Sequence, residues 1–390
     1  MRVTHLITRL ILGGAQENTV ASVLGLHEIP GLQVELISGP THGLEGSLEN
    51  AFSSLPGLLT VTPHLIRPLH PWHDALALRD LTRLLRERAP DIVHTHSGKA
   101  GILGRIAARR AGVPLIIHTI HGPSFGSFQG PLANALFTAA ERHAARCTTH
   151  FVSVSNAMTR QYLAAGVGRP DQFTRIFSGF PLEPFLQARN DPDVRSRLGL
   201  APDEFVLGVI ARLTALKGHD DLFAVAPRLV QRCPKIRFLL VGDGDLRERF
   251  EQQADATGFR ERFVFTGLVP PSQIPQLAGV MDALIHLSAR EGLARALAQA
   301  LAAARPVIAY DADGAGEVCV DGETGFLVAP GDLDALVERV AKVAGDRELR
   351  QRLGQRGQEL VRRCFPVERM VAALHELYAR LAKERGLSSQ

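Results

Sequence analysis

Residues 283–310 read ALIHLSAREGLARALAQALAAARPVIAY, and this stretch decides the fold class. A short apolar run at 283–286 leads into a loop with Glu291 and Gly292, then an alanine-rich helical run and a second apolar run at 307–309. Short, almost wholly apolar runs of this kind predict strands that are buried on both faces of a sheet. Because a helical run separates the two strands, they are expected to be parallel neighbours covered by that helix.

The same alternation extends over almost the whole chain. In the first half we expect helices near 16–27, 74–88, 99–111, 131–145 and 156–165, and strands at 3–7, 34–38, 91–94, 115–119 and 151–154. In the second half the expected strands are 205–210, 237–241, 263–265, 283–286 and 307–309. Pro, Gly and Asp gather between the two series, at about 180–200. The sequence therefore predicts an α/β fold with two Rossmann-like, doubly wound parallel-sheet domains that face a cleft.

The composition excludes several classes of protein. A chain of 390 residues with 45% hydrophobic and 22% charged residues is typical of a two-domain globular protein. Its four cysteines lie far apart and form no CxxC pair, which argues against a disulfide framework or a thiolate zinc site. The sequence contains no run of about 18 apolar residues, so no membrane-spanning helix is expected. The N-terminal apolar stretch is interrupted by His5, Thr8 and Arg9, so we interpret it as a strand rather than a signal peptide and expect a cytoplasmic protein.

The basic residues are unevenly distributed. Residues 1–185 contain 16 Lys and Arg against 12 Asp and Glu, whereas the remainder is balanced. Arg105, Arg109 and Arg110 form one cluster, and Arg142 and Arg146 form another. The simpler interpretation is that these arginines lie on solvated helix faces; the alternative is contact with an anionic membrane or a phosphate-bearing acceptor. Nucleic acid is not expected, because no basic stripe is interleaved with aromatic residues.

Two groups of residues after predicted strands suit an anionic ligand. Gly13 and Gly14 follow the first strand, where they allow a sharp turn before a helix whose N-terminal amides attract anions; a plain turn is the alternative. Arg212 follows the strand at 205–210, and Lys217 stands just before the next helix. Both cations therefore lie at the predicted cleft, where they suit a diphosphate, although surface cations are also common.

Histidines mark the ends of two strands in the first half. His94 and His96 share one face of the strand that ends in HTH, and His121 follows a neighbouring strand in HTIHGP. A metal site at His94 and His96 is conceivable, but no third ligand has convincing spacing. We therefore expect no metal and interpret these histidines as the lining of a polar cleft.

The loop after the strand at 283–286 is the last candidate. Glu291 follows this strand, and Gly292 is expected to open a helix whose amides point into the cleft. Asp311 and Asp313 resemble a DxD metal motif, but such triplets arise easily after strands, so we interpret them as turn residues.

Together these segments resemble the family 4 retaining glycosyltransferases of the GT-B fold. The resemblance rests on the order and spacing of motifs that are weak individually. They are GGAQENT (13–19), DIVHTHSGKAGILGRIAA (91–108), HTIHG (118–122), SVSNAM (153–158), ARLTALKG (211–218), VGDGDLRERFE (241–251), FTGLV (265–269), EGLARALAQAL (291–301) and GETGFLV (322–328).

The resemblance implies a division of labour between the domains. Residues 1–185 would form an acceptor-side domain and 186–365 a domain that binds a nucleotide-sugar donor, while a helix at 366–390 would pack back on the first domain. The acceptor would be a glycan, a lipid-linked molecule or a small molecule, and the donor a UDP-sugar. No cofactor and no metal would be required. The enzyme would act in the cytoplasm, with possible peripheral contact at the inner face of the membrane.

The resemblance also implies roles for individual residues. Gly13 and Gly14 would lie near the donor phosphates, and His121 would contact the donor sugar near its reacting carbon. Arg212 and Lys217 would hold the diphosphate. Glu291 would bind the donor sugar by hydrogen bonds, while the amides near Leu293 and Ala294, after Gly292, would meet the phosphates. The family's second glutamate, which binds the ribose, is replaced here by Gln299.

Two other functions stay open at this stage. A nucleotide-sugar 2-epimerase has a related fold, but it needs acidic groups for proton transfer at C2 of the sugar. A catalytically weak sugar-nucleotide-binding subunit is suggested by Gln299 alone. An amide can still accept a hydrogen bond from a ribose hydroxyl, so this substitution is expected to weaken a contact rather than remove it.

Overall fold

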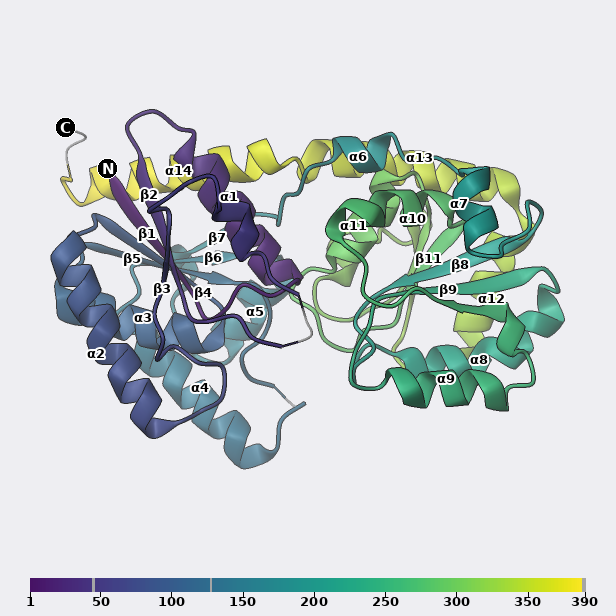
Figure 1. Ribbon diagram of the computed structural model, residues 1–390, viewed down its shortest axis with the longest axis horizontal. Helices are drawn as coiled ribbons and strands as arrows, with labels where there is room; N and C mark the ends of the chain where they lie inside the picture. Colours follow the sequence, from purple (N-terminus) through teal and green to yellow (C-terminus); the bar gives the residue numbers. More distant parts are fainter. Residues whose placement is uncertain (44–45, 127, 388–390) are drawn as a thin grey trace. The chain divides into compact units, whose positions relative to one another are not determined.

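The computed structural model describes residues 1–43, 46–126 and 128–387, and the chain divides into two compact units (Figure 1). The first unit contains Met1–Phe180 and the chain from Val367 on, and the second contains Pro181–Pro366. The chain passes from the first unit to the second after Phe180, whereas the sequence predicted this boundary after residue 185. Both units are α/β, as predicted.

The first unit is built on a parallel sheet of seven strands in the order β3-β2-β1-β4-β5-β6-β7. The strands are β1 (Arg2–Ile7), β2 (Gln33–Ser38), β3 (Leu59–Val61), β4 (Ile92–His96), β5 (Leu115–Ile120), β6 (His150–Ser153) and β7 (Phe173–Arg175). The helices are α1 (Gly14–His27), α2 (Pro71–Arg88), α3 (Gly98–Ala111), α4 (Pro131–Ala145), α5 (Asn156–Ala164) and α14 (Val367–Glu384). Strands β3 and β7 were not predicted, because each has only three residues and is partly exposed.

Alternating side chains of this sheet pack on different helices. Val3 of β1 and Ile117 of β5 belong to a core with α1 and α14. Leu6 and Ile116, which have the opposite parity in these two strands, belong to a second core with α2 and α3. Strands that are buried on both faces in this way need apolar residues on both faces, and these four residues supply them, whereas β4 (IVHTH) also buries polar side chains.

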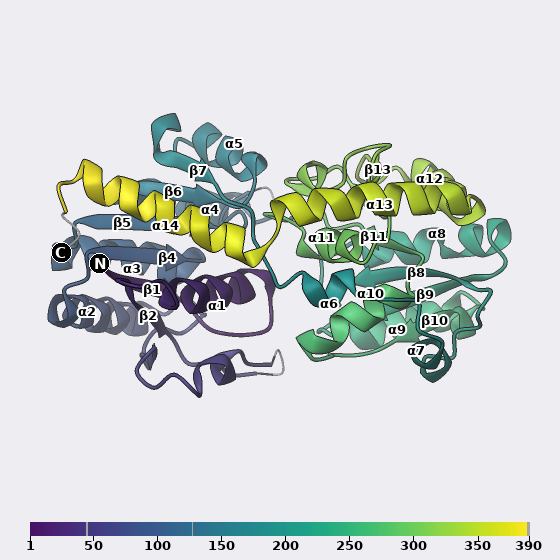
Figure 2. The same cartoon turned by 90° about the horizontal axis from the view of Figure 1, so that it is seen from above.

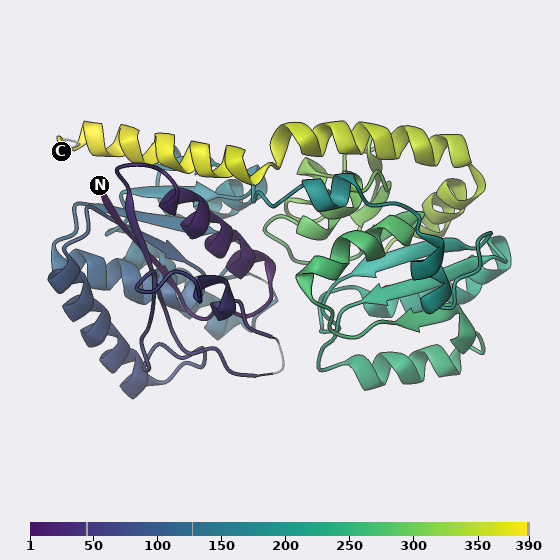
Figure 3. The same ribbon diagram turned by 45° about the horizontal axis from the view of Figure 1, so that its top comes forward.

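Helix α14 returns to the first unit and lies beside α1 (Figures 2 and 3). The approach is close: a Cβ atom on Gly25 of α1 would lie 2.4 Å from Cγ2 of Val371. Met370 adds polar contacts, since its sulfur accepts hydrogen bonds from Nδ2 of Asn18 at 3.0 Å and from the amide of Gly179 at 3.2 Å. The last helix is therefore part of the first unit's core, although the whole second unit separates it from that unit in the sequence.

The second unit contains a parallel sheet of six strands in the order β10-β9-β8-β11-β12-β13. The strands are β8 (Phe205–Ile210), β9 (Ile236–Val241), β10 (Phe263–Phe265), β11 (Ala283–His286), β12 (Val307–Tyr310) and β13 (Gly325–Val328). The helices are α6 (Glu183–Leu186), α7 (Pro192–Arg197), α8 (His219–Arg232), α9 (Arg247–Ala256), α10 (Ile274–Val280), α11 (Arg295–Ala302), α12 (Leu333–Gly345) and α13 (Arg347–Cys364). Among the described residues, no helix has both the length and the apolar character that a membrane crossing needs.

The strand order of each sheet reverses direction once. In the first unit this happens between β1 and β4, and in the second between β8 and β11. In sheets with such a reversal, the loops after the two strands diverge to opposite sides of the sheet, and ligands bind at the strands' carboxyl ends. Gly13 and Gly14 follow β1, Arg212 and Lys217 follow β8, and Glu291 follows β11, so the predicted residues lie at these positions.

Candidate active site

The second unit brings Lys217 and Glu291 together. They lie in the loops after β8 and β11, which are paired strands, and Nζ of Lys217 contacts Oε1 of Glu291 directly. Both side chains are largely buried, at 20% and 19% exposure. Two charges that are 74 residues apart in the sequence therefore form one partly desolvated ion pair.

Hydrogen bonds between the two loops explain why this pair forms. The carbonyl of Leu216 accepts hydrogen bonds from the amide of Ala289 at 2.9 Å and from Oγ of Ser288 at 3.2 Å. Gly218 has φ of 74°, and a Cβ atom there would lie 2.1 Å from the carbonyl oxygen of Leu287. Only glycine fits this close contact in the left-handed conformation, so the sequence KG at 217–218 places the lysine against the neighbouring loop.

Two further side chains contact Glu291. Nε2 of His286 lies 3.3 Å from the same oxygen that Lys217 contacts. Oδ2 of Asp313 accepts a hydrogen bond from the Glu291 amide at 2.8 Å. The sequence interpretation of Asp313 as a turn residue missed this contact. The signal was available, because Asp313 follows β12 and parallel neighbours end at the same edge of a sheet.

The surroundings keep Glu291 ionised. Burial alone would raise the pKa of its carboxyl group, but the charge of Lys217 and the interaction with His286 outweigh burial and hold this pKa well below its ordinary value. The carboxylate is therefore available as a hydrogen-bond acceptor at any physiological pH. Lys217 in turn is a cation that is already fixed in place, which suits an anionic ligand.

The predicted helix start after Glu291 is wrong by three residues. Helix α11 begins at Arg295 with Ala294 as its N-cap, so Gly292, Leu293 and Ala294 form the end of a buried loop. Ala294 has ψ of 92°, which is extended backbone, because the chain is held to its neighbours up to Glu291 and turns into the helix only afterwards. The amides of the first turn of α11 still lie directly after this loop.

Arg212 and Gln299 lie on either side of this cluster in the sequence. Arg212 is exposed in the loop that follows β8. Gln299 is half-buried in α11, and its side chain makes no hydrogen bond within the described part of the chain. Its amide is therefore free to meet a ligand group.

The remaining predicted site residues belong to the first unit. Helix α1 begins at Gly14 with Gly13 as its N-cap, two residues earlier than predicted. His121 directly follows β5, and its Nε2 lies 2.9 Å from Nδ1 of His96. The helix N-terminus and His121 thus both follow strands of the same sheet at their carboxyl ends.

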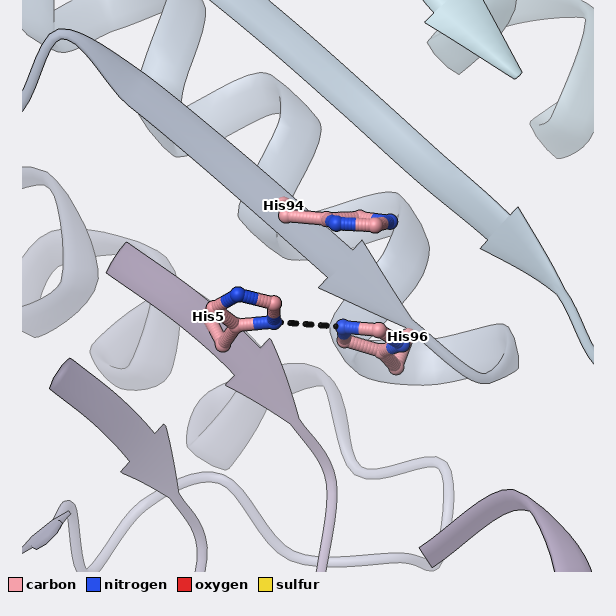
Figure 4. A group of neighbouring side chains, drawn as sticks. All are labelled: His5, His94 and His96. Carbon is pink, nitrogen blue, oxygen red and sulfur yellow. Dashed lines mark hydrogen bonds between the residues drawn. The ribbon is translucent and has the colours of Figure 1, made fainter. Parts of the chain in front are cut away.

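The structure supplies a third histidine that the sequence interpretation did not find. His5 of β1 is the register partner of His94 in β4, and His5, His94 and His96 are buried with ring nitrogens within 4.8 Å of one another (Figure 4). A group of this kind could hold a metal ion. The missing signal was the pairing of β1 with β4, which a doubly wound strand order implies.

One arginine was misplaced by the sequence interpretation. Arg105 does not lie on a solvated helix face: it is fully buried, and its Nη2 donates to Oε2 of Glu141 at 2.6 Å. Arg109, Arg110 and Arg146 are exposed. Arg105 is therefore a structural residue and cannot contribute to a basic surface.

Family models match most of the chain. The model for glycosyl transferases group 1 matches residues 190–360, and the model for the glycosyl transferase 4-like domain matches residues 19–176. The UDP-Gal:alpha-D-GlcNAc-diphosphoundecaprenol alpha-1,3-galactosyltransferase of Escherichia coli is 31% identical over 292 residues, which are 74% of this chain and 75% of that protein. This chain belongs to the group 1 glycosyltransferases.

The names of relatives and the titles of similar structures mention more than one nucleotide. A GDP-mannose-dependent alpha-(1-6)-phosphatidylinositol monomannoside mannosyltransferase of Mycolicibacterium smegmatis is 30% identical over 291 residues, 71% of this chain and 73% of that protein. The crystal structure of Anabaena HepE with UDP and glucose has a TM-score of 0.82 at 21% identity and covers 97% of this chain and 100% of that one. The GT-B fold predicted from the sequence is confirmed, and the enzyme is a glycosyltransferase.

Proposed function

We propose that this glycosyltransferase moves a sugar, with retention at the anomeric carbon, from a nucleotide-diphosphate sugar to a hydroxyl group of a glycan, lipid-linked or small-molecule acceptor. The observation that carries the proposal is the contact between Lys217 and Glu291 at the carboxyl ends of β8 and β11. A fixed cation suits the donor's diphosphate, and an ionised carboxylate beside it suits the hydroxyls of the donor's sugar.

The main catalytic demand is the negative charge that develops on the leaving diphosphate. Lys217, Arg212 and the amides at the start of α11 can stabilise this charge. On donor binding, Lys217 would exchange part of its contact with Glu291 for a phosphate oxygen. Because these groups already supply positive charge, we expect transfer to proceed without an added divalent metal.

Two side chains would hold the donor's sugar. Glu291 would accept hydrogen bonds from its hydroxyls, and His121 would contact it near the reacting carbon. The acceptor hydroxyl would attack from the side of the leaving group, and the leaving phosphate would take its proton. No carboxylate is assigned as a covalent nucleophile, in contrast to the two-carboxylate plan of glycosidases.

The nucleotide is the least constrained part of the donor. The relatives include one named for UDP-galactose and one named for GDP-mannose, and HepE was crystallised with UDP. We propose a UDP-sugar, with the side chain of Gln299 placed at a ribose hydroxyl. An amide can accept and donate at this position, so the substitution retains a contact that is weaker than a carboxylate's.

A thermal-shift panel of nucleotide sugars tests the donor, because a ligand that binds the folded state raises the unfolding temperature. We expect one UDP-sugar to stabilise the chain clearly and Lys217→Ala to abolish the shift. Incubation of this donor without acceptor should return it unchanged; an altered nucleotide sugar would mean epimerisation instead. Transfer that stops in EDTA and resumes with Mg²⁺ would contradict metal independence.

A membrane-bound acceptor is favoured by one surface of the first unit. Leu132 and Leu136 lie one turn apart on α4 and are 88% and 62% exposed. Arg142 and Arg146, at the end of the same helix, are also exposed. Exposed leucines and exposed basic residues on one helix suit the surface of an anionic bilayer.

Sedimentation with anionic vesicles tests this surface. We expect binding that weakens at high salt and is lost when Leu132 and Leu136 are both changed to Glu, with Leu268→Glu, another exposed leucine, as the control. Equal sedimentation of the double variant and the unchanged protein would remove the membrane from the proposal.

A further inference from the structure

A row of polar side chains runs through the core of the first unit between His121 and helix α14. Its members, in order, are His121, His96, His5, Tyr378, His94 and Thr119, hereafter the imidazole row. The strand register explains why they meet. His5 is paired with His94, His96 is paired with Thr119, and side chains two residues apart in a strand share a face.

Each neighbouring pair in the row is joined by ring nitrogens or hydroxyl oxygens. Nε2 of His121 lies 2.9 Å from Nδ1 of His96, and Nε2 of His96 lies 2.9 Å from Nδ1 of His5 (Figure 4 shows the second contact). Nε2 of His5 lies 3.5 Å from the hydroxyl of Tyr378. That hydroxyl also contacts Nδ1 of His94 at 2.5 Å, and Nε2 of His94 contacts Oγ1 of Thr119 at 2.6 Å.

The rings inside the row are uncharged. Burial lowers the pKa of His5 to about 3 and the pKa values of His94 and His96 well below the ordinary value, and for His94 and His96 the neighbouring histidines act in the same direction. Burial likewise raises the pKa of Tyr378 well above its ordinary value, so this side chain keeps its hydrogen. A neutral imidazole carries one N–H and one lone pair. Each inner ring therefore donates on one side and accepts on the other.

This rule allows two arrangements of the hydrogens. In the first, His121 donates through Nε2 to His96, His96 donates to His5, and His5 donates to the oxygen of Tyr378. The hydroxyl of Tyr378 then donates to His94, which donates to Thr119. In the second arrangement, every donor in the row becomes an acceptor and every acceptor a donor.

The two arrangements differ at the end of the row. A neutral His121 has a lone pair at Nδ1 in the first arrangement and an N–H at Nδ1 in the second. Both pair every nitrogen inside the row, so neither leaves a buried polar group unsatisfied. Within the described part of the chain, Tyr378 joins His5 to His94, because its hydroxyl donates to one ring while it accepts from the other.

We propose that His5, His94, His96 and Tyr378 are positioning residues for His121: they hold its Nε2 and determine whether its Nδ1 carries the hydrogen. The row thereby sets which tautomer His121 adopts, without burying a charge. The part of the proposal that concerns catalysis rests on the proposed function of His121, whereas the coupling within the row does not.

The same nitrogens could instead ligate a metal ion, and the contacts favour the row. Both nitrogens of His96 and both nitrogens of His94 already have partners, and His5 meets His96 at a hydrogen-bond distance. A metal ion would have to replace several of these contacts. Metal binding is therefore an outcome that the experiment must be able to detect.

The tautomer of His121 is the direct readout. Long-range ¹H–¹⁵N spectra of histidine-labelled protein distinguish Nδ1–H from Nε2–H, and His121→Gln identifies the signals. We expect Tyr378→Phe, which cuts the row at its centre, to change the tautomer ratio of His121 at least threefold and to lower kcat about tenfold. We expect His96→Asn, whose amide can still meet His121 but does not reach His5, to change the ratio as well.

The double variant separates coupling from ordinary destabilisation. If the row transmits the state of Tyr378 through His96, then Tyr378→Phe has no further effect on the ratio once His96 is Asn. Additive effects, or an unchanged ratio in both single variants, would overturn the proposal. His150→Ala is the control, because His150 is a buried histidine of the same sheet that contacts Thr174 at 2.8 Å outside the row. It should leave the ratio of His121 unchanged.

Two further results keep the alternatives apart. Stoichiometric Zn²⁺ binding that is lost in His5→Ala would overturn the row in favour of a metal site. Normal transfer by His121→Gln would remove His121 from the proposed function, and the tautomer ratio would still decide whether the row is coupled.

Discussion

Each unit has a polar cluster at the pair of strands where its strand order reverses, and the two clusters bury their ionisable groups in opposite ways. The charged cluster of the second unit, Lys217, Glu291 and His286, keeps the charges of Lys217 and Glu291 and compensates for their burial by pairing them. The imidazole row of the first unit compensates for burial by losing its charges. These are the two ways in which a protein can bury ionisable groups at tolerable cost.

The difference indicates what each cluster can recognise. A paired carboxylate and ammonium can exchange each other for a charged ligand, so the charged cluster suits the diphosphate side of a donor. A neutral row cannot attract charge, but it can set the tautomer of the histidine at its end. Substitutions and pH changes can disrupt either cluster, and they measure how much each one contributes to stability or to transfer.

The largest expected effect concerns a fully buried ion pair of the first unit. Arg105 and Glu141 have no exposed side-chain surface, and they lie on α3 and α4 rather than in the imidazole row. Glu141→Ala leaves the guanidinium buried without its partner, so we expect the free energy of unfolding to fall by about 3–5 kcal/mol. Urea denaturation followed by circular dichroism measures this change.

An exposed pair in the same unit provides the control. Arg83 and Glu87 are 62% and 54% exposed on α2, and Glu87→Ala should cost less than about 1 kcal/mol. If Glu141→Ala were no worse than Glu87→Ala, burial would not determine the cost of an unpaired charge in this unit.

The second prediction breaks the charged cluster. Lys217→Ala and Glu291→Ala should each lower the rate of transfer at least about a hundredfold, because each removes a group that acts on the charge or orientation of the donor in the transition state. Steady-state kinetics with the donor from the thermal-shift panel measure this loss.

The matched control is an exposed ion pair of the same unit. Lys235 and Asp203 are 69% and 63% exposed, and alanine at either position should leave transfer within about twofold. The double exchange Lys217→Glu with Glu291→Lys should keep a pair and still fail in transfer. Near-normal turnover in either single variant would refute the assignment of Lys217 or Glu291.

The third prediction uses the pH at which each cluster loses stability. The pKa of His5 is lowered in the folded state to about 3, so below the unfolded value of about 6.5 the unfolded chain binds more protons. Stability from the row is therefore complete above pH 6.5 and falls as the pH decreases, by about 1 kcal/mol for each ring per pH unit. The lowered pKa of Glu291 has the same sign, but its contribution is lost only below the unfolded value of about 4.3.

Hydrogen exchange of individual segments at about pH 7.5 and about pH 5.5, on either side of the ordinary histidine pKa, measures this difference after correction for the intrinsic rate. We expect β1 and β4 to lose protection at the lower pH, whereas the loop around Glu291 keeps it. Whole-chain unfolding would be less informative, because burial also lowers the pKa of His219 in the second unit, to about 4. Equal loss of protection in β4 and around Glu291 would contradict the contrast.

The charged cluster could largely be predicted from the sequence, and the imidazole row could not. Lys217 and Glu291 each follow an apolar run, and the carboxyl ends of parallel strands share one edge, so their proximity follows from local patterns. The row needs the pairing of β1 with β4, which brings His5 to His94, and a tyrosine from the last helix. A doubly wound strand order implies the pairing of β1 with β4, but no local pattern brings Tyr378 of the last helix to His94.

Arg105 shows a different limit. Gly101 and Ala108, which are its i−4 and i+3 neighbours on α3, are small and buried, and this marks one side of the helix as a packed face. The cluster of positive charge in RIAARRAG nevertheless predicted solvent, because the compensating Glu141 is on another helix. A buried charge cannot be recognised before its partner is known.

The fourth prediction adds a charge to the second unit. Gln299→Glu should strengthen donor binding or leave it unchanged, with a gain of at most tens-fold, since hydrogen bonds to charged groups contribute about 1.5–3 kcal/mol against about 1 kcal/mol for neutral ones. Isothermal titration with UDP measures this change. Gln299→Ala, which removes the contact, should weaken binding a few-fold, and a tenfold loss in Gln299→Glu would place this side chain away from the ribose.

The smallest expected effect concerns Asp313, which supports the charged cluster from outside. Its Oδ2 accepts the Glu291 amide at 2.8 Å, and its backbone is left-handed with φ of 49°. Asparagine keeps an acceptor oxygen and tolerates this conformation, so Asp313→Asn should lower transfer only a few-fold. Alanine loses both and should cost about tenfold. Asp311→Asn changes an exposed carboxylate of the same loop and should have no effect. If Asp313→Asn reduced transfer as far as Glu291→Ala does, Asp313 would act on the ligand itself and would belong to the charged cluster.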